Sequence, residues 1–222
     1  MDLAVLALIT LIASTVNGAL GYGFSSITVP VALIFYTNRI LNPALVLVEL
    51  VINGYVLFIN RKSIPTIWWR VAPILIGLVI GVAIGSYILS LVHPAWVKFV
   101  TYIMLLPLIL LQAAGIRKPI KAEKAIAIPF GVGIGTLYSV TTISGPPLAV
   151  LFNNQGYAKQ DFRAALGVIR VAEGIFTGIA YYFIGLYSYE SMAIIPYIIP
   201  SVLVGIPLGS YLIRLMDHET FR

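Results

Sequence analysis

The chain alternates between long apolar stretches and short polar ones. Seven apolar segments are separated by connections that hold most of the lysines and arginines. Five of them cover residues 43–60, 71–92, 95–114, 162–186 and 191–215, and two longer ones cover 2–36 and 122–153. A helix needs about 20 apolar residues to cross a hydrocarbon core of about 30 Å. The pattern therefore predicts an all-α polytopic membrane protein with five segments of ordinary spanning length.

The two long segments are interrupted by glycine, proline and hydroxyl residues. Each exceeds 30 residues, which as straight helix would measure about 45 Å or more. The interruptions lie at 17–30 in the first segment and at 131–135 and 138–147 in the other. Glycine and proline clusters break helices, and irregular backbone at membrane depth must be satisfied by protein or by a wet cavity. Both breaks are therefore candidates for a binding site.

Two parts of the first half of the chain recur in the second half. Residues 26–35 align with 142–151, and residues 81–89 align with 205–213, where both copies read Gly-xxx-Gly-Ser-Tyr. The offsets are 116 and 124, so the order of the elements is the same in both halves. Self-similarity of this kind predicts an internal repeat.

The predicted repeats cover residues 1–116 and 117–222. The first contains the broken segment 2–36 and three helices, and the second contains the broken segment 122–153 and two helices. By alignment with the last helix of the first repeat, a further helix would begin near Asp217. We therefore expect the second repeat to lack its last helix, either because the chain is truncated or because the protein has no eighth hydrophobic segment.

The distribution of Lys and Arg distinguishes two topologies. If all seven segments cross the membrane, the two sides receive 7 and 6 basic residues, with Arg170 left inside a segment. If the two long segments are re-entrant hairpins, the counts become 11 and 2, and only Arg39 and Lys98 lie on the poorer side. The positive-inside rule favours the hairpins. It predicts a multi-pass protein of the cytoplasmic (inner) membrane, with the N-terminus outside and loops 61–70 and 117–124 in the cytoplasm.

Each predicted repeat contains one hairpin and three crossings, so the second repeat enters from the opposite face. Inverted repeats with broken helices are typical of secondary transporters, whose sites lie near the bilayer midplane.

Composition narrows the choice of chemistry. Of the 222 residues, 60% are apolar and 10% are charged, and the formal net charge is +6. The basic residues lie in loops, which indicates membrane orientation and not a nucleic-acid partner. The chain has no cysteine, so disulfides and thiolate metal sites are excluded. We expect no metal or other cofactor, since His93 and His218 lie at segment ends. The N-terminus begins Met1-Asp2-Leu3 without a basic leader, so no cleaved signal peptide is expected.

The breaks predict an anion site. Thr28 and Ser144 each lie two residues before a proline, Pro30 and Pro146, as a hydroxyl N-cap before a proline-containing first turn would. Two half-helices would then begin at the bilayer centre. Their N–H groups and positive dipole ends attract an anion by about 0.3–1 kcal/mol per helix, and by up to about 2 kcal/mol. Alternatively, these hydroxyl groups only satisfy broken backbone.

The candidate substrate-binding residues are those of the two breaks together with one arginine. They are Asn17, Gly21, Gly23, Ser25, Ser26, Thr28, Thr141, Thr142, Ser144, Gly145 and Arg170.

Three ionisable residues lie within predicted membrane segments: Glu49, Arg170 and Glu173. Each costs about 2.5–3.5 kcal/mol there unless it is paired or hydrated. Arg170 and Glu173 are three residues apart on one helix and could neutralise each other. Glu49 has no partner nearby in sequence, which favours proton coupling or a cross-helix pair with Arg170. Glu49 and Glu173 are therefore assigned to proton coupling or charge pairing.

Glycines recur at four-residue spacing in two predicted helices. They are Gly77, Gly81 and Gly85 in one helix, and Gly205 and Gly209 in the other. Small residues at this spacing let membrane helices approach closely. We expect these glycines to form packing surfaces, not binding sites.

Three features together resemble the sulfite exporter TauE/SafE family of membrane permeases. They are the glycine-rich break that ends in Pro30, its echo Ser144-Gly145-Pro146-Pro147, and Asp161-Phe162-Arg163 after the second hairpin. The resemblance covers nearly the whole chain. It implies transport of sulfur-containing anions such as sulfite or organosulfonates, usually export driven by the proton gradient. Family members often carry three consecutive glycines where this chain reads Gly21-Tyr22-Gly23-Phe24-Ser25, so we expect Tyr22 and Phe24 to narrow the site.

The sequence pattern also bears on several functional classes other than a carrier. An anion channel, or a permease for another small anion, could use the same midplane site. A cation transporter would need several inward carboxylates or histidines, and the two histidines lie at segment ends, which argues against it. An enzyme would need a nucleophile–base or metal constellation, and no such spacing occurs. A protein that only packs would not need the breaks. The predicted partners are a small inorganic or organic anion and the lipid bilayer, without nucleic acid, and homo-oligomerisation is left open.

Overall fold

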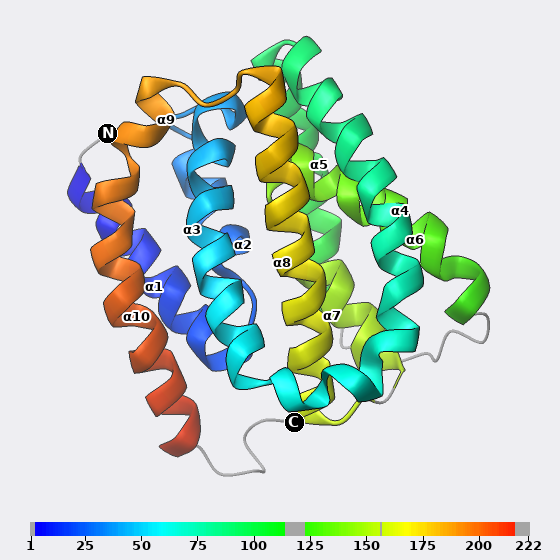
Figure 1. The fold of residues 1–222 in the computed structure, drawn as a ribbon. Coiled ribbons are helices and arrows are strands. Elements are labelled where there is room, and N and C mark those ends of the chain that lie inside the picture. The colour runs from blue at the N-terminus through cyan, green and yellow to red at the C-terminus, as the bar shows by residue number, and fades with distance from the viewer. Residues whose placement is uncertain (1–2, 114–122, 156, 216–222) are drawn as a thin grey trace.

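The structure, a computed structural model, describes residues 3–113, 123–155 and 157–215 and is helical throughout (Figure 1). The long helices are α3 (Asn38–Ile59), α4 (Ile64–Leu91), α5 (Pro94–Ala113), α8 (Lys159–Ile184) and α10 (Ile195–Leu215). The others are α1 (Leu3–Leu20), α2 (Phe24–Ala32), α6 (Glu123–Thr141), α7 (Gly145–Asn154), α9 (Tyr189–Ala193) and a 3-10 turn, η1 (Arg61–Ser63). No strand occurs among these residues, and the predicted all-α fold is confirmed.

Four stretches of helix are long and apolar enough to cross a membrane, by length and composition. They are Asn38–Ile59, Arg61–Leu91, Gln160–Ile184 and Tyr189–Leu212. They coincide with four of the five predicted spanning segments. The fifth, α5, has 20 residues, about 30 Å of helix. The chain is therefore a polytopic membrane protein.

The predicted segment 191–215 is divided into a short helix and a long one. The Ser188 hydroxyl accepts a hydrogen bond from the Ser191 N–H at 3.1 Å, which caps α9 at its N-terminus. The chain bends at Ile194 and continues as α10.

The two long segments each form a pair of helices whose outer ends lie at the same end of the bundle (Figure 1). The α1–α2 pair has its ends near the N-terminus, and the α6–α7 pair has its ends at the opposite end of the bundle. Side-chain contacts agree with this arrangement. Arg39, at the start of α3, donates to the Leu89 and Ser90 carbonyls at the end of α4. Arg70, near the start of α4, lies over the Tyr157 ring before α8. The repeat boundaries 1–116 and 117–222 stay a prediction.

The irregular backbone is shorter than the sequence predicts. In the first pair only residues 21–23 leave the helix, and in the second only residues 142–144. The predicted break at 131–135 is wrong, because these residues continue α6. Two of their glycines, Gly131 and Gly135, pack against the backbone of α4.

Glycines bring two helix pairs into backbone contact, as predicted. A Cβ atom on Gly77 or Gly81 in α4 would collide with the carbonyl oxygens of Ile128 and Val132 in α6. A Cβ on Gly209 in α10 would collide with the backbone of Thr15 in α1. The pairs α4–α6 and α1–α10 are the most extensive helix contacts of the described residues. Each short helix before a break is thus held by one long helix.

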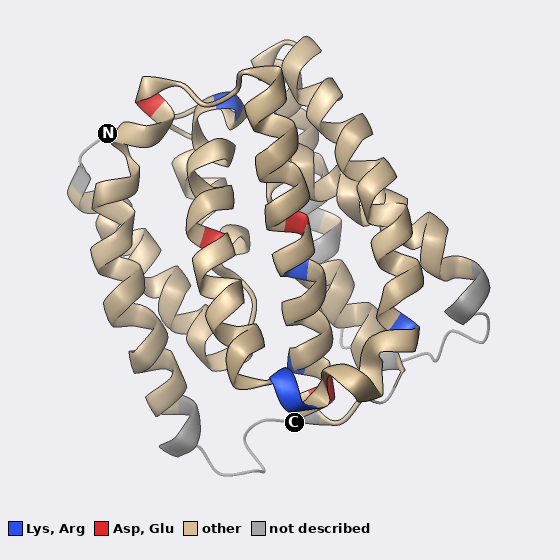
Figure 2. Cartoon of the chain, viewed as in Figure 1, with Lys and Arg blue, Asp and Glu red and all other residues tan. Residues whose placement is uncertain are grey.

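Charged residues gather at the two ends of the bundle, with a few midway along α3 and α8 (Figure 2). Arg39 and Lys98 lie in the first turns of α3 and α5, whereas Arg61 and Lys62 form η1 at the other end. Most of the predicted cytoplasmic loop 117–124 lies outside the described residues, as do His218 and the segment near Asp217.

Replacement of a packing glycine tests these backbone contacts. We expect Gly131→Ala to destabilise the protein by about 1–3 kcal/mol, because the new methyl group meets the Ile74 carbonyl in α4. Gly133→Ala is the matched control: it lies in the same helix with nothing within 4 Å, and it should be neutral or stabilise by up to about 1 kcal/mol. Thermal unfolding of both variants in detergent measures the difference, and equal effects would contradict the contact.

Cysteine labelling tests the topology, because the chain has no cysteine of its own. Single-cysteine variants are made at three exposed positions, Lys62, His93 and Glu190. Intact cells that express each variant are treated with a membrane-impermeant maleimide. If the two long segments are re-entrant hairpins, His93→Cys and Glu190→Cys react from outside the cell, and Lys62→Cys reacts only after the membrane is permeabilised. If all seven segments crossed, positions 62 and 190 would react from the same side.

Candidate functional site

The first break depends on two glycines and an arginine from a distant helix. Gly21 and Gly23 have φ angles of 86° and 110°, which residues with a side chain rarely adopt. Arg163 in the first turn of α8 donates to the Ala19 carbonyl at 2.5 Å. The guanidinium thus satisfies a carbonyl that the end of α1 leaves without a helical partner.

The second break depends on side chains of α3 and α8. Thr142 has a φ of 59°, a strained conformation for a β-branched residue that persists only where the surroundings enforce it. The last carbonyls of α6 are satisfied from outside the helix. Tyr181 donates to the Ser139 carbonyl at 2.5 Å, and Asn42 donates to the Val140 carbonyl at 2.7 Å.

The two breaks meet inside the bundle. A Cβ atom on Gly145 would lie 3.3 Å from Tyr22 of the first break and 3.0 Å from Nη1 of Arg170. Glycine at position 145 therefore allows the tyrosine and the guanidinium to approach the start of α7. Tyr22 also packs edge-on against Phe162 of α8, with ring centroids 6.5 Å apart. Phe24, expected to narrow the site, lies instead in the hydrophobic core.

A buried ion pair joins α3 and α8 beside the breaks. Arg170 Nη2 lies 2.8 Å from Glu49 Oε1, and the two side chains are only 2% and 1% exposed. Ser25 of α2 donates to the same carboxylate oxygen, and Tyr138 of α6 donates to Oε2 at 3.0 Å. The predicted cross-helix pair between Glu49 and Arg170 is confirmed. Three donors from three other helices hold this carboxylate.

Glu173 has a different environment. Ser144, the N-cap residue of α7, donates to Glu173 Oε2 at 2.6 Å. The other carboxylate oxygen, Oε1, is buried without a hydrogen-bond partner among the described residues. The sequence also allowed Arg170 to pair with Glu173 on the same helix. In the structure the arginine pairs with Glu49 instead.

The half-helix starts differ from the prediction in one case. Thr28 is not an N-cap, because α2 begins at Phe24 with Gly23 in the capping position. Ser144 occupies the N-cap of α7 as predicted, but its hydroxyl contacts Glu173 and caps no backbone group. Residues 146 and 147 are prolines and have no N–H to offer. The free N–H groups at the meeting point therefore come from the first turn of α2 and from Gly145.

The other predicted substrate-binding residues differ in whether their polar atoms have hydrogen-bond partners. Both amide atoms of Asn17 and the hydroxyl of Thr28 are buried without a partner among the described residues. Thr141 donates to the Leu137 carbonyl, whereas Ser26 is partly exposed. Buried polar groups require a hydrogen-bond partner such as water. Asn17 and Thr28 can therefore take up a polar solute or ordered water.

Sequence reasoning missed Tyr138 and Arg163 as site residues. The sequence predicts Tyr138 to lie in a break, whereas it lies in α6 four residues before Thr142 and contacts Glu49 across the bundle. The sequence identifies Arg163 as part of the motif Asp161-Phe162-Arg163 but predicts no contact for it at the site. Neither contact leaves a signal in the sequence, because both join residues more than 80 positions apart.

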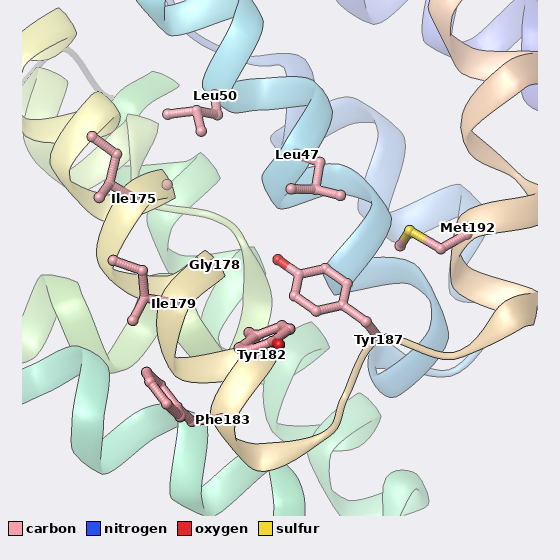
Figure 3. Close-up of a pocket in the computed structure, with 10 residues that line it drawn as sticks. Leu47, Leu50, Ile175, Gly178, Ile179, Tyr182, Phe183, Tyr187 and Met192 are labelled. Carbon is pink, nitrogen blue, oxygen red and sulfur yellow. The ribbon is translucent and has the colours of Figure 1, made fainter.

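A separate apolar groove of about 570 Å³ lies between α3, α8 and α9 (Figure 3). Leu47 and Leu50 line it from α3, Ile175 and Ile179 from α8, and the Tyr187 hydroxyl points toward α8 near Gly178. Its lining includes no charged side chain. The groove is therefore distinct from the charged site.

A buried ion pair where two broken helices meet, inside a bundle of membrane-length helices, places the protein in the class of polytopic membrane proteins with an internal charged site. This is an architecture of secondary transporters. The sequence model of the family described as sulfite exporter TauE/SafE matches residues 6–222. The chain belongs to this family. Membership implies a membrane transporter of sulfur-containing anions and not an enzyme. No curated protein and no solved structure was found to match the chain.

A double-mutant cycle tests the network around Glu49. We expect Tyr138→Phe to lower the free energy of unfolding by about 1–3 kcal/mol, because one oxygen of a buried carboxylate loses its donor. In a Glu49→Gln background the same change should cost less, with a coupling of about 0.5–3 kcal/mol. Unfolding in detergent provides the four values, and strict additivity would show that the two side chains do not interact.

Proposed function

We propose that the protein is a secondary transporter that exports a small sulfur-containing anion, of the sulfite or organosulfonate class, across the cytoplasmic membrane with proton coupling. One observation carries this proposal: Arg170 is fully buried at the meeting point of the two breaks. A guanidinium at membrane depth is costly and is by default functional. The family supports transport of sulfur-containing anions.

In this proposal the anion binds between Arg170 and the two half-helix starts. Arg170 Nη2 is engaged by Glu49, whereas its Nε has no partner among the described residues and its Nη1 lies beside Gly145. Guanidinium N–H groups match the oxygens of oxyanions. The first turn of α2 adds N–H groups and a positive dipole end.

Tyr22 sets the size of the proposed site. Its ring contacts Gly145 and Phe162, so it covers the start of α7 on the side of α8. A small anion with few atoms beyond its sulfur and oxygens is favoured at such a site. We assign the discrimination between sulfite and larger sulfonates to Tyr22.

The proposed transport cycle uses the two hairpins as moving parts. The α1–α2 pair is held mainly by α10, and the α6–α7 pair is held mainly by α4. If the halves are inverted repeats, these assemblies correspond, and rocking one against the other would open the site alternately to each face. The proposed orientation has the N-terminus outside.

Flux measurements in proteoliposomes test this function. The purified protein should transport radiolabelled sulfite, and sulfate, thiosulfate and small sulfonates are compared as competitors. We expect Arg170→Lys to lower the rate about tenfold or more, because hydrogen bonds to charged groups are worth about 1.5–3 kcal/mol and an ammonium lacks the guanidinium fork. Arg61→Ala, at an exposed position of η1, is the control and should transport normally.

A second variant separates folding from binding. Removal of Arg170 alone leaves Glu49 unpaired and costs about 3–5 kcal/mol. The double variant Arg170→Gln, Glu49→Gln replaces the ion pair by a neutral pair and should remain folded by size-exclusion chromatography but not transport. Wild-type rates in this folded variant would remove Arg170 from the substrate site.

A further inference from the structure

The two glutamates of the site occupy corresponding positions in the predicted repeats, but their carboxylates accept different numbers of hydrogen bonds. Glu49 and Glu173 are 124 residues apart, the same offset that relates the Gly-xxx-Gly-Ser-Tyr motifs. Each accepts a hydrogen bond from a serine at the start of a half-helix, Ser25 for Glu49 and Ser144 for Glu173. Glu49 also has Arg170 and Tyr138 as partners. Glu173 has one free oxygen.

Unpartnered polar atoms continue from Glu173 along the faces of α3 and α8. On α8, Arg170, Glu173 and Thr177 share one face at spacings of three and four, and on α3 Glu49 and Asn53 do so at a spacing of four. Arg170 Nε, Glu173 Oε1, Thr177 Oγ1 and Asn53 Nδ2 are all buried without a partner among the described residues.

The two helices pack against each other and run in opposite directions (Figure 1). Asn53 and Thr177 therefore lie toward opposite ends of the bundle, with the glutamates between them. Buried polar atoms of this kind are satisfied by ordered water. Water that bridges them would form a strip through the middle of the α3–α8 contact, about one helical turn (roughly 6 Å) to either side of the glutamates.

We infer that Glu173 binds the coupled proton, that water along this strip delivers it, and that the proton and the anion cross together. This inference rests on the proposed function. Protonation forms one O–H bond at Glu173 Oε1 and breaks one in a hydronium ion, and release reverses this step. Glu49 remains an ionised partner of Arg170 because three donors hold it.

Charge balance gives the direction of coupling. With both carboxylates ionised, Glu49, Arg170 and Glu173 carry a net charge of −1, which repels an anion. The charged and titratable groups near Glu173 are Arg170 on its own helix, Glu49 on α3 and Tyr138 on α6. Within the membrane, α4 and α7 add no Asp, Glu, Lys or Arg between positions 71–91 and 145–154.

Protonation of Glu173 brings the net charge to zero and releases the positive end of α7 from its own carboxylate. Proton binding then favours anion binding, and by reciprocity anion binding favours proton binding. A carrier with this linkage moves both in the same direction, in contrast to one that exchanges an entering proton for a departing anion. Export would then follow the outward gradient of the anion, and the proton would leave with it.

Exchange of radiolabelled sulfite between the two sides of proteoliposomes, at equal acidic or equal alkaline pH, tests this inference. We expect wild-type exchange to fall about fivefold or more from acid to alkali, the lower end of measured coupling between sites. Glu173→Gln, which is permanently neutral, should exchange sulfite at a rate that depends much less on pH. Glu173→Asp should restore the dependence. Sulfite ionises identically in all samples, so a difference between variants reports the protein.

Matched variants and a gradient complete the test. Glu49→Gln, at the corresponding position, should lose exchange at every pH, and Thr177→Val should slow net proton-linked flux more than it slows exchange. A gradient that is acid inside should accelerate sulfite efflux from wild-type vesicles but not from Glu173→Gln vesicles.

Persistence of the wild-type pH dependence in Glu173→Gln, or acceleration of efflux by acid outside, would overturn the inference. Should Glu173→Gln fail to fold, the Asp and Thr177→Val variants and the sign of the gradient effect decide the matter. If the wild-type protein exchanges no sulfite at either pH, the proposed function itself fails.

Discussion

Three ionisable side chains, Glu49, Arg170 and Glu173, are buried at the centre of the membrane bundle, and this burial constrains the whole structure. An isolated charge at this depth is costly, and removal of one member of a buried pair costs about 3–5 kcal/mol. Here α3 and α8 supply the ion pair between Glu49 and Arg170, and α2 and α6 supply the hydroxyl donors Ser25 and Tyr138. Because each donor comes from a different helix, the charges fix how these four helices meet.

The same constraint governs the two breaks. An interrupted helix leaves carbonyls without partners, and lipid cannot satisfy them. Arg163, Tyr181 and Asn42 each donate to such a carbonyl from α3 or α8. The two central helices therefore carry both the charged cluster and the groups that stabilise the breaks. Movement of a hairpin relative to α3 and α8 would change both at once, which is a physical route from substrate binding to conformational change.

The proposed mechanism depends on a difference between two carboxylates: Glu49 accepts hydrogen bonds from three donors, whereas one oxygen of Glu173 has no hydrogen-bond donor among the described residues. Glu49 and Glu173, which are related by the offset of the predicted repeat, receive the same kind of serine contact, but only Glu49 receives the arginine. A carboxylate with several donors is held in its charged form, and one with a free buried oxygen can change its protonation state at less structural cost. Two glutamates with the same kind of serine contact can thus have different roles.

The all-α membrane fold, the spanning segments, the presence of two breaks and the close packing at Gly81 and Gly209 could be predicted from the amino-acid sequence. These follow from local properties: apolar length, glycine spacing and the intolerance of helices for glycine–proline clusters. It also indicated that Glu49 needed a partner and offered Arg170 as one, because a lone charge in lipid is too costly.

The positions of the breaks and the groups that surround them depend on how the helices pack and could not be predicted from the sequence. Residues 131–135 remain helical because α4 packs against their backbone, and Thr28 lies inside a helix because two glycines with positive φ place the turn earlier. The contacts of Tyr138 and Arg163 join residues far apart in sequence. Local patterns cannot encode such contacts, since the energy that selects them arises only when the helices pack together.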